Sequence, residues 1–343
     1  MTRRFVTAVP GLGPMVSRQL GRLPGIVVGE SGFDGRSDVV LFETTRESRS
    51  AVMDLRLAED VFVEVGHTLR GEGDKSGWIV GRLWRPERVQ RALSVWAEEV
   101  RPLAGTMTFR VIARVLQERS FRRTDLRRQL IRAIQRDRPR WRLEDPAQIE
   151  VWVGEYAPGR FVAGLRLSDE RMRQHDGRTV ERRGALRPTV ASAMVLLAGE
   201  PSGVLLDPCC GSGTILREAL AAGWQARGLD IDDEAVRAAR RNAAAADVRA
   251  GDARKLGLAS QSVESCVSNL PFGQQYTIQG GLHSWLRSVL GEMARVTRPG
   301  GRVVVLVPQL PHAVVPGSLR LQDRVRIRLL GTRTTIWAYD RIR

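Results

Sequence analysis

A glycine-rich turn at residues 207–214, Asp-Pro-Cys-Cys-Gly-Ser-Gly-Thr, has the composition of a ligand-binding loop. It follows an apolar run typical of a buried strand and precedes a stretch that favours a helix. Glycine lets a backbone approach a ligand closely, and a helix start offers free N–H groups. A pyrophosphate would gain nothing from Asp207, which precedes the glycines. The turn therefore predicts a cofactor that is cationic or carries an amino group.

Two further carboxylates follow the next two predicted strands. Asp230 ends a strand after Gly-Leu, and a carboxylate at this place accepts hydrogen bonds from ribose hydroxyls. Helix capping is the alternative for this region, and we assign it to the neighbouring Asp232 and Asp233. Asp252, in Gly-Asp-Ala, could accept a hydrogen bond from an adenine amino group, with turn formation as its alternative.

A fourth strand is followed by Asn-Leu-Pro-Phe-Gly at residues 269–273. The Asn269 side-chain oxygen and the Leu270 carbonyl can both accept from one exocyclic amine. Phe272, on a turn stiffened by Pro271, can stack on the flat base that carries that amine. Taken alone, the motif could be a structural turn. Its order after the other three motifs favours a substrate-binding function.

Alternating strands and helices position these four motifs. The apolar runs predict strands at 204–207, 225–230, around Val248, 263–269 and 302–307, and helices at 190–197, 214–222, 234–246 and 282–296. Strands separated by helices imply a parallel, doubly wound sheet, which binds ligands at the carboxyl ends of its strands. The last residues, 324–330 and 334–339, alternate like an antiparallel hairpin on the edge of that sheet.

The first half of the chain has a mixed α+β pattern. Strands are predicted at 5–9, 26–28, 39–42, 61–65, 109–116, 149–153 and 160–167, and helices at 13–23, 48–57, 85–100 and 124–134. Residues 171–187 are polar and weakly periodic, which indicates a linker.

Positive charge is concentrated in one stretch of that half. The chain has 54 basic and 38 acidic residues, a net charge of +16, which predicts attraction to polyanions. Residues 101–142 alone hold 13 arginines and three acidic residues. A GC-rich genome could account for the arginine usage, and the arginines of the 124–134 helix could form a solvated face. Their local excess favours contact with nucleic acid.

The remaining composition excludes several classes of protein. Cys209, Cys210 and Cys266 are too few for a disulfide framework, and no CxxC or histidine cluster indicates a metal site. Cys266 lies within a predicted strand, so we expect a buried apolar residue rather than a nucleophile. We expect no signal peptide, and no run of 18 apolar residues is present. We expect a cytoplasmic protein without a metal, and we favour a monomer.

The four motifs together resemble class I S-adenosylmethionine-dependent methyltransferases that methylate amines, whose fourth motif is Asn/Asp-Pro-Pro-Tyr/Phe. Leu270 replaces the first proline, and leucine here is familiar from the RNA guanine-N2 branch. Residues 182–191, Arg-Arg-Gly-Ala-Leu-Arg-Pro-Thr-Val-Ala, resemble the segment that leads into the catalytic domain of THUMP-containing tRNA guanine-N2 methyltransferases. Stretches similar to a THUMP domain lie at 109–111, 120–121 and 143–146.

The resemblance implies an α/β fold class, with a C-terminal Rossmann-like methyltransferase sheet that carries an antiparallel edge hairpin, preceded by α+β ferredoxin-like and THUMP domains. The implied organisation is a ferredoxin-like domain at 1–65, a THUMP RNA-binding domain at 66–168, a linker at 169–187 and the methyltransferase domain at 188–343.

The resemblance also implies the cofactor, S-adenosylmethionine, and the residues around it. The implied cofactor ligands are Thr189, Asp207, Cys209, Gly211, Gly213, Asp230, Asp252 and Asn269. The target base would be held by Asn269, Leu270, Pro271 and Phe272. RNA contacts are expected at Arg122, Arg123, Arg127, Arg128 and Arg132.

The implied reaction is direct methyl transfer to the exocyclic N2 of a guanine flipped out of tRNA. Position six in the acceptor stem is favoured over position ten. Positioning of the amine by Asn269 and Leu270 would supply most of the catalysis, in principle about 7–11 kcal/mol. One alternative is methylation of another amine, in rRNA guanine, DNA adenine or protein glutamine. The other is a non-catalytic RNA-binding protein with a vestigial cofactor fold.

Overall fold

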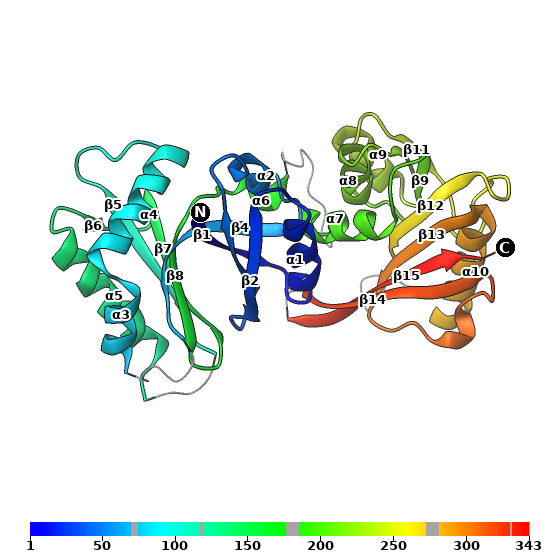
Figure 1. Ribbon diagram of the computed structural model, residues 1–343. Helices are drawn as coiled ribbons and strands as arrows, with labels where there is room; N and C mark the ends of the chain where they lie inside the picture. The colour runs from blue at the N-terminus through cyan, green and yellow to red at the C-terminus, as the bar shows by residue number, and fades with distance from the viewer. Residues whose placement is uncertain (70–74, 117–119, 176–184, 272–280, 330, 343) are drawn as a thin grey trace. The chain divides into compact units, whose positions relative to one another are not determined.

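The computed structural model describes residues 1–69, 75–116, 120–175, 185–271, 281–329 and 331–342. The chain forms two compact units, Met1–Arg173 and Gln174–Arg343 (Figure 1). Phe272 and the Arg182–Gly184 part of the segment noted above lie outside the described residues. No helix within the described ranges is long and apolar enough to span a bilayer.

The N-terminal unit is built on one eight-stranded sheet in the order β2-β3-β1-β4-β8-β7-β5-β6 (Figure 1). Its elements are β1 (Thr2–Ala8), α1 (Gly13–Gly21), β2 (Ile26–Phe33), β3 (Asp38–Thr44), α2 (Arg49–Met53), β4 (Ala58–His67), α3 (Ser76–Leu83), α4 (Pro86–Glu99), β5 (Thr108–Arg114), α5 (Arg123–Asp137), β6 (Arg142–Leu143), β7 (Ile149–Ala157) and β8 (Arg160–Arg166). Most were predicted from the sequence.

Strand β4 connects the two halves of this sheet. It pairs with β1 on one side and β8 on the other, and it runs across the predicted boundary between residues 65 and 66. A buried ion pair adds a second connection, because Arg4 on β1 donates to Glu99 on α4 at 2.8 Å. The assignment of ferredoxin-like and THUMP domains to this unit stays a prediction.

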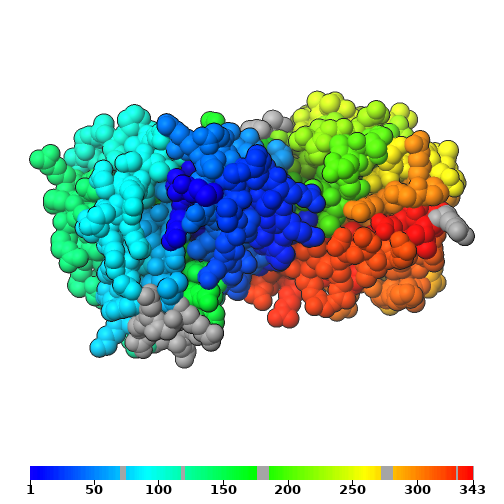
Figure 2. All heavy atoms as spheres, viewed as in Figure 1, coloured from blue at the N-terminus to red at the C-terminus, as the bar shows by residue number. Residues whose placement is uncertain are grey.

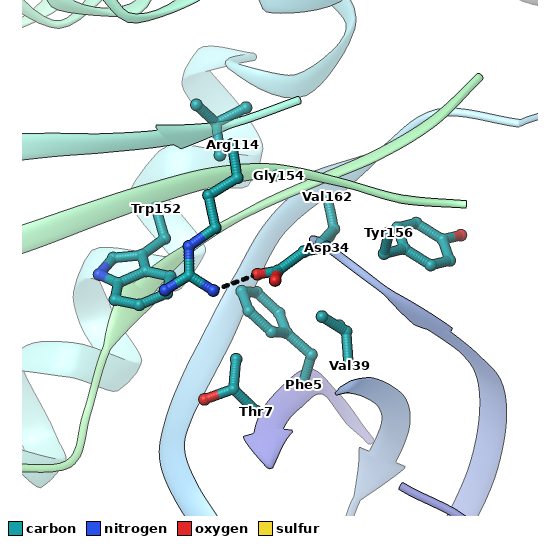
Figure 3. A pocket seen from close by; sticks show the side chains of 10 residues that line it. Phe5, Thr7, Asp34, Val39, Arg114, Trp152, Gly154, Tyr156 and Val162 are labelled. Carbon is teal, nitrogen blue, oxygen red and sulfur yellow. Dashed lines mark hydrogen bonds and ion pairs between the residues drawn. The ribbon is translucent and has the colours of Figure 1, made fainter. Parts of the chain in front are cut away.

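Aromatic side chains fill the sheet face near this junction. Phe5 and Phe62 stack with ring centroids 4.5 Å apart, and Trp152 packs against Phe62. Beside them, Arg114 lies over Trp152 and donates to Asp34 at 2.5 Å (Figure 3). A cavity whose lining includes Phe5, Asp34, Arg114 and Trp152 measures about 10 Å³, which is room for one water molecule at most. It is therefore a packing defect rather than a ligand site.

Three elements of this unit differ from the prediction. Helix α3 was not predicted, because glycines at 77 and 81 weaken the helical pattern of Ile79, Val80 and Leu83. The helix predicted at 48–57 forms only at Arg49–Met53. The predicted linker begins with a short helix, α6 (Arg171–Gln174), which buries Met172.

The C-terminal unit is a seven-stranded sheet in the order β11-β10-β9-β12-β13-β15-β14. Its elements are α7 (Pro188–Leu197), β9 (Val204–Asp207), α8 (Thr214–Ala221), β10 (Gln225–Asp230), α9 (Asp233–Asn242), β11 (Asp247–Ala250), β12 (Val263–Asn269), α10 (Leu282–Val296), β13 (Thr297–Val307), the 3₁₀ turn η2 (His312–Val314), β14 (Leu319–Leu329) and β15 (Thr332–Arg341).

The topology of this sheet creates a ligand-binding edge. Strands β9 to β13 are parallel, and β15 pairs antiparallel with both β13 and β14. The strand order reverses between β9 and β12, so the carboxyl ends of these two strands flank the crevice where such sheets bind ligands. The predicted doubly wound sheet with an antiparallel edge hairpin is confirmed.

One hydrophobic cluster of this unit lies between the sheet and α10. Leu286, Leu290 and Met293 of α10 recur at helical spacing and pack against Val303 and Val305 of β13. All five side chains are fully buried, and burial of each is worth about 1.5–3 kcal/mol. This packing holds β12 and β13, and with them the edge that carries Asn269.

Candidate functional site

The turn between β9 and α8 has the backbone that its glycines predict. Gly211 and Gly213 adopt positive φ angles of 53° and 83°. A Cβ at Gly213 would lie 3.1 Å from the Ala239 Cα of α9, whereas a Cβ at Gly211 would meet nothing within 4 Å. Gly213 therefore packs the turn against α9, and Gly211 leaves one side of the turn open for a ligand.

Asp230 holds this turn from the neighbouring strand. Its Oδ2 accepts a hydrogen bond from the Gly211 N–H at 2.8 Å, and its Oδ1 accepts one from the Asp232 N–H at 3.0 Å. Asp232 caps α9 by accepting from the Glu234 N–H, so the predicted assignment of helix capping to the neighbours of Asp230 is confirmed for Asp232. Carboxylate oxygens accept more than one hydrogen bond each, and Asp230 keeps capacity for a ribose.

Asp207 is the most deeply buried carboxyl group of the site, with 1% of its surface exposed. Its Oδ1 accepts from the Ser268 hydroxyl at 2.7 Å and from the Cys209 N–H at 3.1 Å. Burial raises the pKa of Asp207 to about 7, against the opposing effect of these two donors. The Ser268 bond also joins the glycine-rich turn directly to β12, the strand that ends at Asn269.

Asp252 forms an ion pair with Arg254, two residues further along the chain. The Gly251 N–H donates to the Asp230 carbonyl at 2.9 Å, which links the third motif to the second. The Arg254 guanidinium pairs with Asp252 at 2.7 Å and holds the pKa of its carboxyl below the usual range. An adenine amino group would share Asp252 with Arg254.

Asn269 ends β12 beside the Asp207–Ser268 pair. Its Oδ1 is buried and has no hydrogen-bond partner among the described residues. The following residue, Leu270, is 1% exposed and donates its N–H to the Leu306 carbonyl at 3.2 Å. Pro271 is half-buried. The motif is therefore anchored through Leu270, while Asn269 presents an unsatisfied acceptor.

The other predicted site residues fall into two groups. Thr189 lies in the first turn of α7 and is buried, and Cys209 lies half-buried in the glycine-rich turn. Cys266 is fully buried in β12, as predicted, and burial raises the pKa of its thiol to about 12. Such a thiol is not poised as a nucleophile. Within the described residues no cluster of three or more metal-ligating side chains occurs.

The five predicted RNA-binding arginines lie at α5 of the N-terminal unit. Arg122 precedes the helix, and the others lie on it; all are exposed, while Leu126 and Leu130 face inward. Two of the arginines have partners within the unit, since Arg127 donates to the Val111 carbonyl and Arg128 pairs with Asp125. The structure thus presents this helix face to solvent.

Two contacts of the site were not predicted. Ser268 precedes Asn269 in the sequence, but only the pairing of β9 with β12 brings it to Asp207. Arg254 lies two residues after Asp252, and its pairing with that carboxylate could have been suspected from this spacing.

Comparisons with known proteins agree with this geometry. Residues 175–315 match the family model of the RMKL-like methyltransferase domain. U6 snRNA (guanine-N(2))-methyltransferase THUMPD2 from Bos taurus is 37% identical over 143 residues, which are 39% of this chain and 28% of the bovine protein. A tRNA (guanine(10)-N2)-dimethyltransferase from Pyrococcus abyssi is 28% identical over 165 residues, 45% of this chain and 49% of the archaeal protein. The chain spans about a quarter to a half of the length of these relatives.

Solved structures resemble the chain over its whole length. TrmN from Thermus thermophilus superposes with a TM-score of 0.80 at 24% identity and covers 100% of both chains. A possible methylase from Clostridium difficile 630 gives a TM-score of 0.70 at 15% identity, with 100% of this chain covered and 98% of that one. The resemblance to guanine-N2 methyltransferases is thereby confirmed: the C-terminal unit has the class I methyltransferase fold and carries a match to the RMKL-like methyltransferase domain family.

Proposed function

We propose that this protein is an S-adenosylmethionine-dependent RNA methyltransferase that forms N2-methylguanosine in tRNA, with position six of the acceptor stem as the favoured target. The match of residues 175–315 to a methyltransferase domain supports the reaction class. Relatives named as guanine-N2 methyltransferases of tRNA and U6 snRNA support the target atom and an RNA substrate.

The observation that carries the proposal is the buried, unpartnered Oδ1 of Asn269. Leaving a buried acceptor without a donor costs about 1–3 kcal/mol, so a buried acceptor at a ligand-binding edge calls for a donor that arrives with the ligand. An exocyclic amine has two N–H groups, one for Asn269 and one for the adjacent backbone carbonyl of Leu270. Acceptance of both hydrogens orients the nitrogen lone pair outward, toward an electrophile.

The residues around Asn269 fit the proposed cofactor. S-adenosylmethionine would supply a methyl group on a positively charged sulfur. Asp207, Asp230 and Asp252 bring three carboxyl groups to the same sheet edge, where they suit a ligand that carries an amino group, ribose hydroxyls and an adenine amine. The open side of Gly211 lets that ligand approach the backbone.

The chain's own residues then act mainly by positioning. Asn269 holds the amine of a flipped-out guanine, and the nitrogen forms its new bond to the methyl carbon as the carbon–sulfur bond breaks. The extra proton on the nitrogen leaves to solvent afterwards, so the reaction needs no strong base in the site. The exposed arginines of α5 would contact the RNA backbone.

The test is transfer of labelled methyl from S-adenosylmethionine to unmodified tRNA, followed by nucleoside analysis. Wild type should yield N2-methylguanosine. Asn269→Ala should lose about a hundredfold or more in kcat at saturating cofactor, and titration measures its cofactor affinity separately. Asn269→Asp, which retains an acceptor oxygen at this place, serves as the matched control and should keep more activity than Asn269→Ala.

Other products would redirect or end the proposal. Methylated adenosine, or label in rRNA or protein but not in tRNA, would assign a different amine as the substrate. Cofactor binding without transfer to any nucleic acid or protein would favour a non-catalytic RNA-binding protein. Equal activity of wild type and Asn269→Ala would refute the role of the unpartnered oxygen.

A further inference from the structure

The edge strand β14 carries a row of arginines on one face. Arg324, Arg326 and Arg328 alternate along the strand, so their side chains share a face of the sheet. Their partners on β15 are Trp337, Thr335 and Arg333, which place a fourth arginine beside Arg328. We call Arg324, Arg326, Arg328 and Arg333 the β14 arginine row. Its segment lies at the surface in Figure 2, in orange to red.

The row is exposed and lacks counter-charges. All four arginines are exposed, and none forms an ion pair with any residue that the structure describes. Arg324 lies over the Trp337 ring at 5.2 Å, which fixes one end of the row. At the opposite end of the same strand Arg320 has a carboxylate within reach, Asp340 at 3.7 Å. The uncompensated charge is therefore local to the second half of β14.

The strand register places the row at the ligand-binding edge. Asn269 of β12 pairs with Leu306, Leu306 with Ile336, and Ile336 with Val325 of β14. Three strand spacings separate β12 from β14, a distance of about 14 Å. Because β14 runs parallel to β13, Arg326 and Arg328 continue past the row of Asn269, by up to about 10 Å. The positive charge thus extends beyond the carboxyl ends of the strands, on the same edge as the site but on the sheet face opposite that of Asn269 and Val325.

An exposed edge strand also needs charge to prevent pairing with other sheets. Charges of either sign protect an edge strand from such pairing. Edge protection therefore does not explain why four positive charges gather at one end of β14. Alternate residues of a strand lie about 7 Å apart, a spacing close to that of successive phosphates on a nucleic-acid strand. Guanidinium groups bind phosphate oxygens bidentately, which favours a phosphate backbone as the partner.

We infer that the β14 arginine row binds the phosphate backbone of the RNA next to the target nucleotide. This inference rests on the proposed function and extends it, since it assigns an RNA-contacting surface to the catalytic unit itself. The row binds the RNA strand on the side of the flipped-out nucleotide, while Asn269 binds its base. It acts on RNA affinity and leaves the chemical step unchanged.

The test is RNA affinity as a function of salt, measured with the full-length protein and an unmodified tRNA transcript. The association constant for RNA falls as salt rises, and Arg326→Gln and Arg328→Gln should each make the plot of its logarithm against log salt shallower by about 0.7–0.9. The double variant should change the slope by twice as much. Arg320→Gln is the matched control, because it removes the same charge from the other end of the same strand. Its slope should equal that of wild type.

Activity and stability measurements complete the test. For the double variant we expect kcat/KM for tRNA to fall roughly tenfold, with kcat at saturating tRNA unchanged, as for loss of ground-state binding. Arg328→Lys should restore most of the salt slope. A lower thermal midpoint or aggregation of the double variant with an unchanged slope would instead assign the row to protection of the sheet edge and overturn the inference.

Failure of the proposed function would look different. If wild type neither binds nor methylates RNA, both proposals fall. If wild type methylates tRNA and the slopes of the double variant and Arg320→Gln are equal, only the arginine row is refuted.

Discussion

Replacement of Asp207 by asparagine should stabilise the unliganded protein while weakening its cofactor site. Asp207 is buried, and its pKa of about 7 lies well above the value of about 3.9 for an unfolded chain. A carboxyl group with a raised folded-state pKa contributes stability that is complete below the unfolded pKa. That stability is lost as pH rises through the folded pKa.

The magnitude follows from the gap between the two pKa values. About three pH units at about 1.4 kcal/mol per unit give an upper limit of roughly 4 kcal/mol, fully developed above pH 7. Asparagine matches the neutral carboxyl group in size, and its oxygen can still accept from Ser268 and the Cys209 N–H. Asp207→Asn should therefore exceed wild type in unfolding free energy at pH 8, and the difference should shrink toward zero as the pH approaches 4.

The assay is denaturant unfolding of both proteins without cofactor across this pH range, followed by cofactor titration at pH 8. We expect the variant to bind S-adenosylmethionine at least tenfold more weakly, because it lacks the charge that favours an amino group. A variant that is less stable than wild type by a constant amount at every pH would refute the reasoning. It would show that the Asp207 carboxyl group is ionised in the folded protein and that its hydrogen bonds stabilise the charge.

Two further predictions concern the neighbouring backbone and hydroxyl group. In urea unfolding, Gly213→Ala should lower the unfolding free energy by more than Gly211→Ala does. A left-handed backbone costs alanine about 1–2 kcal/mol at either position. Only at Gly213 does the new methyl group also collide with α9. Equal losses would contradict the packing described for the turn. Ser268→Ala removes a donor that lowers the pKa of Asp207, so cofactor affinity should reach its high-pH plateau at a higher pH than in wild type. An unchanged profile would mean that the Ser268 hydroxyl donates elsewhere in solution.

Much of the C-terminal unit could be predicted because its signals are local. Strands β9, β10 and β12 and helix α10 begin and end where the apolar runs do, and the carboxylates and Asn269 follow those runs directly. The parallel direction of β9 to β13 follows from the alternation of strands and helices, whereas the order of the strands is seen only in the structure. The four motifs therefore meet at one edge, as the sequence indicates.

The rest depends on contacts between distant residues. Ser268 and Asp207 are 61 residues apart in the sequence, and the hydrogen bond between them forms only because β9 pairs with β12. The position of the β14 arginine row relative to Asn269 is set by the strand register across β13, β15 and β14, which the sequence does not show. Helix α3 forms despite its glycines because Ile79 and Leu83 are fully buried by tertiary packing. Each of these is a property of the folded chain rather than of a local stretch.

The passage of β4 through the middle of the N-terminal sheet has a mechanical consequence. Strand β4 pairs with β1 up to Val63 and with β8 from Phe62 onward, so the two pairings overlap at Phe62 and Val63, and displacement passes from β1 to β8 through these two residues. The strands on either side of β4 therefore belong to one continuous sheet rather than to two separate sheets. Because α5 packs against β5 of the same sheet, a force applied to the arginines of α5 reaches the first strands of the chain through β7, β8 and β4.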